Sequence, residues 1–243
     1  MKNDGRPGSR AVGENPVLNT ILVSLPDNEF QALRSQLEWQ SLPMNTVLVE
    51  PGSPLQGGYF LNDGLASAVV PTGDGRSVEV AGIDKNGFVG IPLLVGMQMS
   101  IMRTIIRVPG DGFRISREAL EKFLPSLPQL RASLGKAAML QGMQAAQTAA
   151  CNRLHDLQQR LARWLLNTCD GVGPEFGITQ EYLAEMLGTG RPSVSLVAGQ
   201  MQKAGVIQYT RGAVKIVDRS ALERLSCECY ANVQRIRNAV VPA

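Results

Sequence analysis

The chain has 243 residues, of which 44% are hydrophobic and 19% are charged, and its formal net charge at pH 7 is +3. This length suits two modest domains or one large one, and the composition excludes the disordered and fibrous classes. A charge of +3 is too small to identify a nucleic-acid partner. Residues 1–16 are polar and glycine-rich, without the apolar run of a signal peptide, and are predicted to form a flexible tail. No stretch is long and apolar enough to cross a membrane, so we expect a cytoplasmic protein with no membrane partner.

Residues 17–125 are predicted to form a β-rich sensor domain. Short helical pieces are expected over residues 17–39, and residues 45–115 consist of short β-type runs separated by Gly, Pro and Asp. Residues 72–75 and 109–112 are rich in Gly and Asp, which tolerate the backbone angles of tight turns, so each segment predicts a β-hairpin. Many short strands at this spacing indicate a sandwich or a jelly-roll barrel.

Residues 126–151 are predicted to form a long dimerisation helix. Residues 129–150 contain no proline and are dominated by Ala, Leu, Met and Gln, which are good helix formers. The apolar positions follow a heptad-like stripe: Leu130, Leu134, Ala137, Ala138, Leu140, Met143, Ala145 and Thr148. Because little in the sensor half is available to cover so long a stripe, the same helix of a second subunit is the simplest partner. Packing within one chain is the alternative.

Residues 152–243 are predicted to form a winged helix-turn-helix domain. Thr179 is placed to cap a helix over residues 180–187, and two glycines in residues 188–190 end it. A second helix begins at Arg191, with Pro192 in its first turn, where proline has no helical hydrogen bond to lose. Its outward positions are predicted to be polar, as a helix in a major groove requires: Arg191, Ser193, Ser195 and Gln200. Two short β-type runs then flank Arg211 and predict a wing.

Residues 191–219 carry five basic residues against the single acid Asp218. A local basic stretch of this kind is typical of a surface that meets a polyanion. A solvated surface with no such partner is the alternative interpretation.

Two segments resemble the CRP/FNR family of bacterial transcription regulators. ITQEYLAEMLGTGRPSVSLVAGQMQKAGVI resembles the helix-turn-helix of that family, and PGSPLQGGYFLNDGLASAVV resembles its cyclic-nucleotide-binding-like barrel. The resemblance covers nearly the whole chain and implies an α+β fold: an N-terminal β-jelly-roll barrel, a long dimerisation helix and a C-terminal winged helix-turn-helix. It also implies a homodimer on an inverted-repeat DNA operator, with RNA polymerase as a further partner.

The resemblance assigns roles to individual residues of the second helix. Arg191 matches the first base-reading arginine of the family, whose guanidinium can bond to guanine O6 and N7. Ser193 matches a position that contacts phosphate. Pro192 stands where the family often has Glu, and Leu196 stands where it often has Arg, so the usual operator half-site is not assumed. The candidate DNA-binding residues are Thr179, Gln180, Thr189, Arg191, Pro192, Ser193, Ser195, Gln200 and Arg211.

The sensor half departs from the cyclic-nucleotide site that the resemblance implies. That site uses a Gly-Glu pair opening a short helix and an Arg-Ser or Arg-Thr pair after it. Here Gly90 is followed by Ile91-Pro92, and Arg103-Thr104 falls one position late. We therefore expect no tight cyclic AMP binding and no cofactor. An unknown small-molecule effector would meet Gly90, Leu93, Leu94, Arg103 and Thr104. The neighbouring residues Val95, Met97, Met99 and Met102 are interpreted as barrel core with contacts to the long helix, or as the lining of an apolar pocket.

The cysteines and the single histidine are predicted to have no functional role. Cys151, Cys169, Cys227 and Cys229 are expected to be reduced, as is usual for a cytosolic protein. A metal site needs more ligands than the Cys227-Cys229 pair supplies, so buried or bystander thiols are expected, with metal binding as the alternative. His155 is interpreted as a linker residue, so no metal is expected. No nucleophile–base set or phosphate loop is visible, and we expect no enzyme. The alternative to a ligand-responsive regulator is a DNA-binding protein whose barrel is only a dimer scaffold.

Overall fold

The computed structural model describes residues 10–210 and 212–240. A small hairpin opens the described chain, formed by β1 (Ala11–Val12) and β2 (Asn15–Pro16). The short helices α1 (Thr20–Val23) and α2 (Asp27–Arg34) follow. Arg10 fixes the hairpin against them, because its guanidinium bonds to the carbonyl of Leu22 at 2.6 Å and pairs with Asp27 at 2.9 Å. Residues 10–16 are therefore part of the folded domain rather than of the predicted tail.

Two antiparallel sheets form the sensor domain, in agreement with the predicted jelly-roll class, and they are not closed into one barrel. One sheet has the order β3-β9-β5 and comprises β3 (Leu37–Leu42), β9 (Gly110–Ser116) and β5 (Gly57–Leu61). The other has the order β4-β8-β6-β7 and comprises β4 (Val47–Val49), β8 (Arg103–Val108), β6 (Leu65–Pro71) and β7 (Ser77–Ile83). Residues 37–39, predicted as the end of a helical region, begin β3. They form a strand because they pair with a distant segment, Leu37 with Ile115 and Trp39 with Phe113 of β9.

The two predicted hairpins have different outcomes. β6 and β7 pair across residues 72–76, where the Thr72 amide bonds to the carbonyl of Arg76 at 2.8 Å, so the first hairpin is confirmed. The second is wrong, because β8 and β9 belong to different sheets. Val108 pairs with Leu65, whereas Gly110 pairs with Leu42. Pro109, which has no amide hydrogen to donate, lies where the chain crosses between the sheets.

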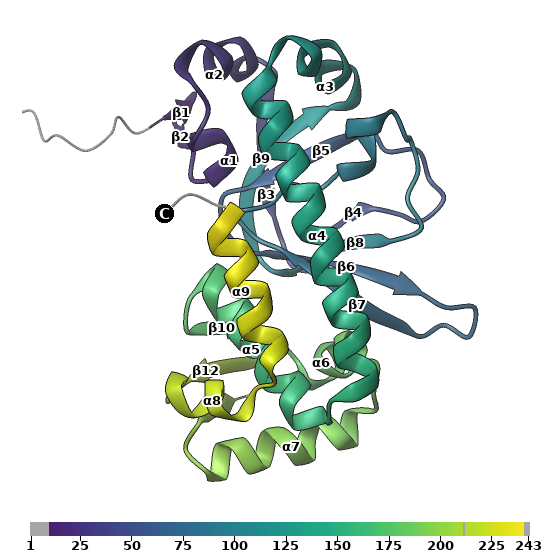
Figure 1. Cartoon of the computed structure of the whole chain (residues 1–243), viewed down its shortest axis with the longest axis vertical. Coiled ribbons are helices and arrows are strands. Elements are labelled where there is room, and N and C mark those ends of the chain that lie inside the picture. The colour runs from purple at the N-terminus through teal and green to yellow at the C-terminus, as the bar shows by residue number, and fades with distance from the viewer. Residues whose placement is uncertain (1–9, 211, 241–243) are drawn as a thin grey trace, which may run out of the picture.

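A long helix, α4 (Pro128–Leu154), runs down the sensor domain to the C-terminal half (Figure 1). Before it lie α3 (Arg117–Phe123), capped by the Ser116 hydroxyl, and the short 3-10 helix η2 (Leu124–Ser126). The 27 residues of α4 span about 40 Å. Leu130, Leu134 and Ala137 of α4 are buried in the sensor core of the same chain. Much of the stripe that was assigned to a second subunit therefore packs within the chain, the alternative that the sequence left open.

The C-terminal half is a winged helix-turn-helix with two extra helices. It contains α5 (Leu157–Val172), β10 (Glu175–Gly177), α6 (Gln180–Met186), α7 (Arg191–Lys203), β11 (Ile207–Thr210), β12 (Ala213–Ile216), α8 (Arg219–Leu225) and α9 (Glu228–Val240). The three strands form a sheet of order β10-β12-β11. α9 turns back and packs along α4, as Figure 1 shows. Among the described residues, none of the helices combines the length and apolar character that crossing a bilayer requires.

Candidate nucleic-acid interface

The first helix of the motif, α6, is fixed at both ends by local chemistry. The Thr179 hydroxyl accepts a hydrogen bond from the Tyr182 amide at 3.3 Å, which satisfies one of the free amides of the first turn. Gly188 follows the last turn with φ +59°, in the left-handed region that favours glycine. The Thr189 amide then bonds to the carbonyl of Ala184 at 2.9 Å and reverses the chain toward α7. Thr179, predicted as a DNA-binding residue, is thus a capping residue in the structure.

The second helix, α7, buries one face and exposes the other. Val194, Ala198 and Met201 are buried against the rest of the domain. The exposed positions include four of the predicted DNA-binding residues, and they are Arg191, Pro192, Ser193 and Gln200. In Figure 1, α7 lies across the end of the molecule farthest from α2 and α3, with no element of the chain beyond it. A helix surface that carries mainly polar side chains, with Leu196 65% exposed among them, has the shape that fits a major groove.

Arg191 is held at the start of α7 by a surface ion pair. Its Nη1 atom lies 3.0 Å from Oε1 of Glu181 on α6, and both side chains are more than half exposed. An exposed pair of this kind stabilises a fold by about 0–1 kcal/mol. A phosphate or a guanine edge can therefore replace Glu181 at little cost to the fold.

Ser195 and Gln180 have a different place from the one predicted. The Ser195 hydroxyl donates to Oε1 of Gln180, and both residues are half-buried. This hydrogen bond joins α7 to α6 instead of leaving Ser195 on the outer face. The reason is geometric, since Ser195 follows the buried Val194 by one position and turns partly toward α6.

The wing has the predicted strands, and Arg211 at its tip lies outside the described residues. Lys215 on β12 pairs with Glu175 on β10 at 3.7 Å, both exposed. The Tyr209 hydroxyl donates to the carbonyl of Ile178 at 2.7 Å, and burial raises the pKa of Tyr209 to about 12, so it stays protonated at neutral pH. The wing is therefore tied to the segment that precedes α6.

Arg219 contributes less to the basic surface than the sequence suggested. Its guanidinium pairs with Asp170 at 2.7 Å and with Glu223 at 2.9 Å. These two carboxylates neutralise it and use its donors to join α8 to α5. Of the basic stretch, Arg191 and Lys203 are the exposed cations that lie on α7 itself.

Comparisons with known proteins agree with this geometry. The family model described as a Crp-like helix-turn-helix domain matches residues 159–225. This match identifies residues 159–225 as a Crp-like helix-turn-helix domain. A curated relative, the global nitrogen regulator of Synechocystis sp., is 22% identical over 184 residues, which cover 72% of this chain and 82% of the relative.

Solved structures share the whole architecture. FixK2 from Bradyrhizobium japonicum superposes with a TM-score of 0.67 at 16% identity, covering 79% of this chain and 98% of that one. A protein from Eubacterium rectale described as a transcriptional regulator of the crp/fnr family gives a TM-score of 0.65 at 17% identity, covering 84% and 96%. At these identities the likeness establishes the CRP/FNR fold.

The candidate effector residues differ in burial and in the direction of their side chains. Gly90, with φ +111°, opens the 3-10 helix η1 (Ile91–Val95), as the resemblance implies. Leu93 is buried in the core and Thr104 is buried on β8, whereas the Arg103 guanidinium faces outward and bonds to Glu50, with Nε 3.1 Å from Oε2. Val95, Met97 and Met99, which were expected in a core or a pocket lining, are more than half exposed. Gly96, with φ +75°, ends η1, and the chain after it is tied to the segment before β5 by backbone hydrogen bonds from Leu55 to Gln98 at 2.7 Å and from Gly52 to Ser100 at 2.9 Å.

Sequence reasoning missed the contact between the helix-turn-helix and the sensor sheet. Arg107 on β8 is 3% exposed and pairs with Glu185 on α6 at 2.8 Å, while its guanidinium lies 4.6 Å from the ring centre of Tyr182. The Ser77 hydroxyl donates to the same glutamate at 2.6 Å. A strand residue and a helix residue 78 positions apart carry no sequence signal of their proximity.

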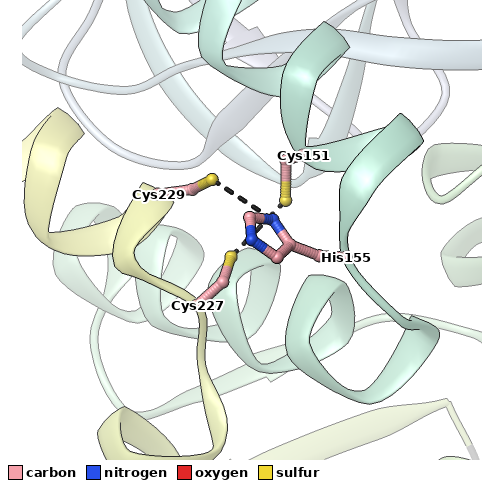
Figure 2. A group of neighbouring side chains, drawn as sticks. All are labelled: Cys151, His155, Cys227 and Cys229. Atoms are coloured by element: carbon pink, nitrogen blue, oxygen red, sulfur yellow. Dashed lines mark hydrogen bonds between the residues drawn. The ribbon is translucent and has the colours of Figure 1, made fainter.

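A second missed feature is a cluster of Cys151, His155, Cys227 and Cys229 (Figure 2). The three cysteines are buried, and burial raises the pKa of Cys151 to about 12 despite the opposing charge of Arg163. The four residues come as two pairs that are far apart in the sequence. Cys151 and His155 lie at the end of α4, and Cys227 and Cys229 lie at the start of α9. Only the packing of α9 on α4 brings the pairs together.

Proposed function

We propose that the protein is a non-enzymatic transcription regulator that binds an inverted-repeat DNA operator as a homodimer without requiring cyclic AMP. The observation that carries this proposal is the exposed polar face of α7, headed by Arg191, next to the wing. A bidentate contact from Arg191 to guanine would supply base recognition, and Ser193 and Lys203 would contact phosphate. RNA polymerase stays a predicted partner by family resemblance.

The outer face of α4 supports the dimer. Its exposed positions include Gly135, Met139, Gly142, Ala146 and Ala149, spaced alternately by four and three residues. This is the heptad spacing of a coiled-coil seam, and small residues let two helices approach closely. Met139 is 62% exposed within one chain, so a second copy would remove a large apolar side chain from water.

The sensor site supports independence from cyclic AMP. Ile91-Pro92 stands where a carboxylate would accept a hydrogen bond from the ribose. Glu50 pairs with Arg103, so a cyclic phosphate would have to displace a carboxylate to reach that guanidinium. These contacts agree with an unknown small-molecule effector, and they agree equally with a barrel that serves only as a scaffold.

The DNA interface is tested with the operator recovered from genome-wide capture of the bound DNA. We expect Arg191→Ala to weaken binding to that duplex by about 1–3 kcal/mol and to relax specificity at one base pair of each half-site. The measurement is fluorescence anisotropy at fixed salt. Arg34→Ala is the matched control, because Arg34 is an exposed arginine on α2 at the opposite end. Equal affinity of wild type and Arg191→Ala for the operator would contradict the placement of α7.

The dimer is tested by light scattering of the purified chain. We expect a mass twice the 26.2 kDa of one chain, and a shift toward the monomer mass for Met139→Glu, because the seam would bury two carboxylates. Val47→Glu on β4 is the control, since Val47 is an exposed apolar residue away from α4. A monomeric wild type at working concentration contradicts the dimer.

Calorimetry tests the effector part separately. We expect no low-micromolar or tighter binding of cyclic AMP to the full-length protein. Saturable binding in that range contradicts this part and leaves the DNA interface untouched. A thermal-shift screen of other nucleotides and metabolites then distinguishes a responsive sensor from a scaffold.

A further inference from the structure

Four side chains known for metal coordination converge at the lower end of α4. Cys151 and His155 lie at the end of that helix, while Cys227 and Cys229 flank the first residue of α9 (Figure 2). One ligand atom from each lies within 4.8 Å of all the others. Sγ of Cys151 is 3.5 Å from Sγ of Cys227, and Sγ of Cys229 is 3.5 Å from Nδ1 of His155.

These separations match the edges of a tetrahedron around one ion. With Zn–S bonds of about 2.3 Å and Zn–N bonds of about 2.0–2.1 Å, tetrahedral ligand atoms lie roughly 3.5–3.8 Å apart. The two short contacts already have this length, and the longest separation of 4.8 Å requires a movement of about one ångström. Three sulfurs and one imidazole nitrogen are a complete ligand set for a closed zinc site.

The groups around the cluster support the same chemistry. Nε2 of His155 lies 3.3 Å from Oε1 of Glu228, so a carboxylate is placed to orient the ring with Nδ1 toward the sulfurs. Metal-binding histidines commonly have such a partner on their other nitrogen. The side-chain amide of Gln147 donates to Sγ of Cys229 at 3.0 Å, which favours a thiolate there.

Charge is also compensated. Zn²⁺ with three thiolates and a neutral imidazole carries a net charge of −1. Arg163 is 7% exposed, acts electrostatically on Cys151 and has a guanidinium Nε with no hydrogen-bond partner among the described residues. Arg163 also acts on the buried carboxyl of Glu79, and an anionic metal site would give this cation a further partner.

We propose that Cys151, His155, Cys227 and Cys229 bind one Zn²⁺ ion as a closed Cys₃His site. When the ion binds, the three thiols release their protons to solvent and no electron is transferred. Because the cysteines are buried and all four positions are filled by the protein, the site has no place for substrate or catalytic water and is structural.

The ion would join two segments 76 residues apart, the end of the long helix and the start of the last one. α4 passes into α5 at His155 and Asp156, so the site lies at the junction between the sensor half and the DNA-reading half. A metal clip here would fix the angle at which α5 and the helix-turn-helix leave α4. The inference does not depend on DNA binding, because metal content is measured on the free protein.

Metal analysis of the full-length protein, purified under reducing conditions without added metal, is the direct test. We expect about one zinc per chain, and about none in Cys227→Ser or Cys229→Ser. Cys169→Ser is the matched control, since Cys169 is the one cysteine outside the cluster, and it should keep its zinc.

Cobalt substitution keeps the test decisive if a cysteine variant fails to fold. The wild-type protein, stripped by a chelator and titrated with Co²⁺, should develop the sulfur-to-cobalt band and the intense visible bands of a tetrahedral thiolate site at one equivalent. Glu228→Gln should keep these bands and weaken metal affinity by about 10–100-fold. No such bands in folded protein, a Cys151–Cys227 disulfide with no metal uptake after reduction, or zinc retained in both Cys227→Ser and Cys229→Ser would overturn the proposal.

Discussion

Arg191 and Arg107 are both paired with a glutamate of α6, and these two ion pairs differ in their exposure to water. Arg191 on α7 meets Glu181 at 3.0 Å, with its side chain 63% exposed. Arg107 on β8 meets Glu185, one helical turn later, at 2.8 Å, with its side chain 3% exposed. The first pair is surrounded by water and can exchange partners, whereas the second is enclosed between the sensor sheet and α6. One short helix therefore carries an exposed ion pair that can exchange partners and a second pair that joins it to the sensor domain.

The largest expected effect comes from breaking the enclosed pair. Arg107→Ala removes the cation that pairs with Glu185 and covers Tyr182, and we expect a loss of about 1.5–3 kcal/mol in the free energy of unfolding, because water can partly solvate the Glu185 carboxylate that is left. Urea denaturation measures the change. Arg191→Ala, the same substitution in the exposed pair, should change stability by less than about 1 kcal/mol while weakening DNA binding. Equal destabilisation by both variants would show that burial does not separate the two pairs.

The turn between α6 and α7 gives the next largest effect. Gly188 has φ +59°, and an added Cβ would meet Cγ2 of Val78 on β7 at 3.3 Å. Gly188→Ala should therefore cost about 1–2 kcal/mol from backbone strain alone, with the contact to the sensor sheet adding to it. Gly205→Ala is the control, because Gly205 has φ +73° with open space around its Cβ position. A smaller loss for Gly188→Ala than for Gly205→Ala in urea denaturation contradicts a tight contact between this turn and the sheet.

The sequence predicts the features of α6 and α7 around the exposed Arg191–Glu181 pair well. Thr179, Gly188 and Pro192 act through neighbours within a few residues, so capping, turn and first-turn chemistry can be read locally. The polar outer face of α7 follows from the helical period of Val194, Val197 and Met201, although the structure buries Ala198 more deeply than Val197. Local rules do not predict the hydrogen bond from Ser195 to Gln180, because this bond depends on the angle between α6 and α7.

The buried contact between Arg107 and Glu185 could not be predicted, because the two residues come from distant segments. Arg107 lies in an ordinary strand, and nothing in its neighbourhood points to Glu185. The same holds for the cysteine cluster, in which the two halves read separately as a lone pair of thiols and a linker histidine. The prediction of a hairpin at residues 109–112 failed for a related reason. The turn composition is the same whether the next strand pairs in the same sheet or in the other.

Replacing a glycine within α7 should change the stability of that helix without removing the Arg191 side chain, so it tests the exposed helix separately from its ion pair. Gly199 lies in the interior of the helix, and a Cβ added there would meet nothing within 4 Å. Gly199→Ala should raise the free energy of unfolding by about 0.5–1 kcal/mol, because alanine loses less backbone entropy on folding. Urea denaturation gives the change, and a destabilised variant would show that this face of α7 is already covered by another part of the protein.

The smallest expected effect concerns Glu79 on β7, whose contribution to the free energy of unfolding should depend on pH. The Trp164 indole of α5 donates to its Oε1 atom at 2.9 Å, so Glu79 also joins the sensor sheet to the DNA-reading half. Burial raises the pKa of Glu79 above 4.5, although bonds from Ser67 and Trp164 and the charges of Arg163 and Arg107 oppose the shift. A raised carboxyl pKa means that the native state holds the proton more tightly than the unfolded chain. Its stabilising contribution is complete below pH 4.5 and is lost as pH rises through the folded pKa.

Glu79→Gln cannot ionise, so the stability of this variant relative to wild type should increase as pH rises from about 5 to about 8. Urea midpoints at the two pH values measure the difference. Glu118→Gln is the control, because hydrogen bonds at the start of α3, first of all from its own backbone amide, lower the pKa of Glu118, and it is ionised in both states over this range. Its difference from wild type should stay constant between the two pH values. A constant difference for Glu79→Gln as well would mean that the two arginines fully offset the burial of this carboxylate, so that the enclosed interface tolerates charge as readily as the exposed face of α7 does.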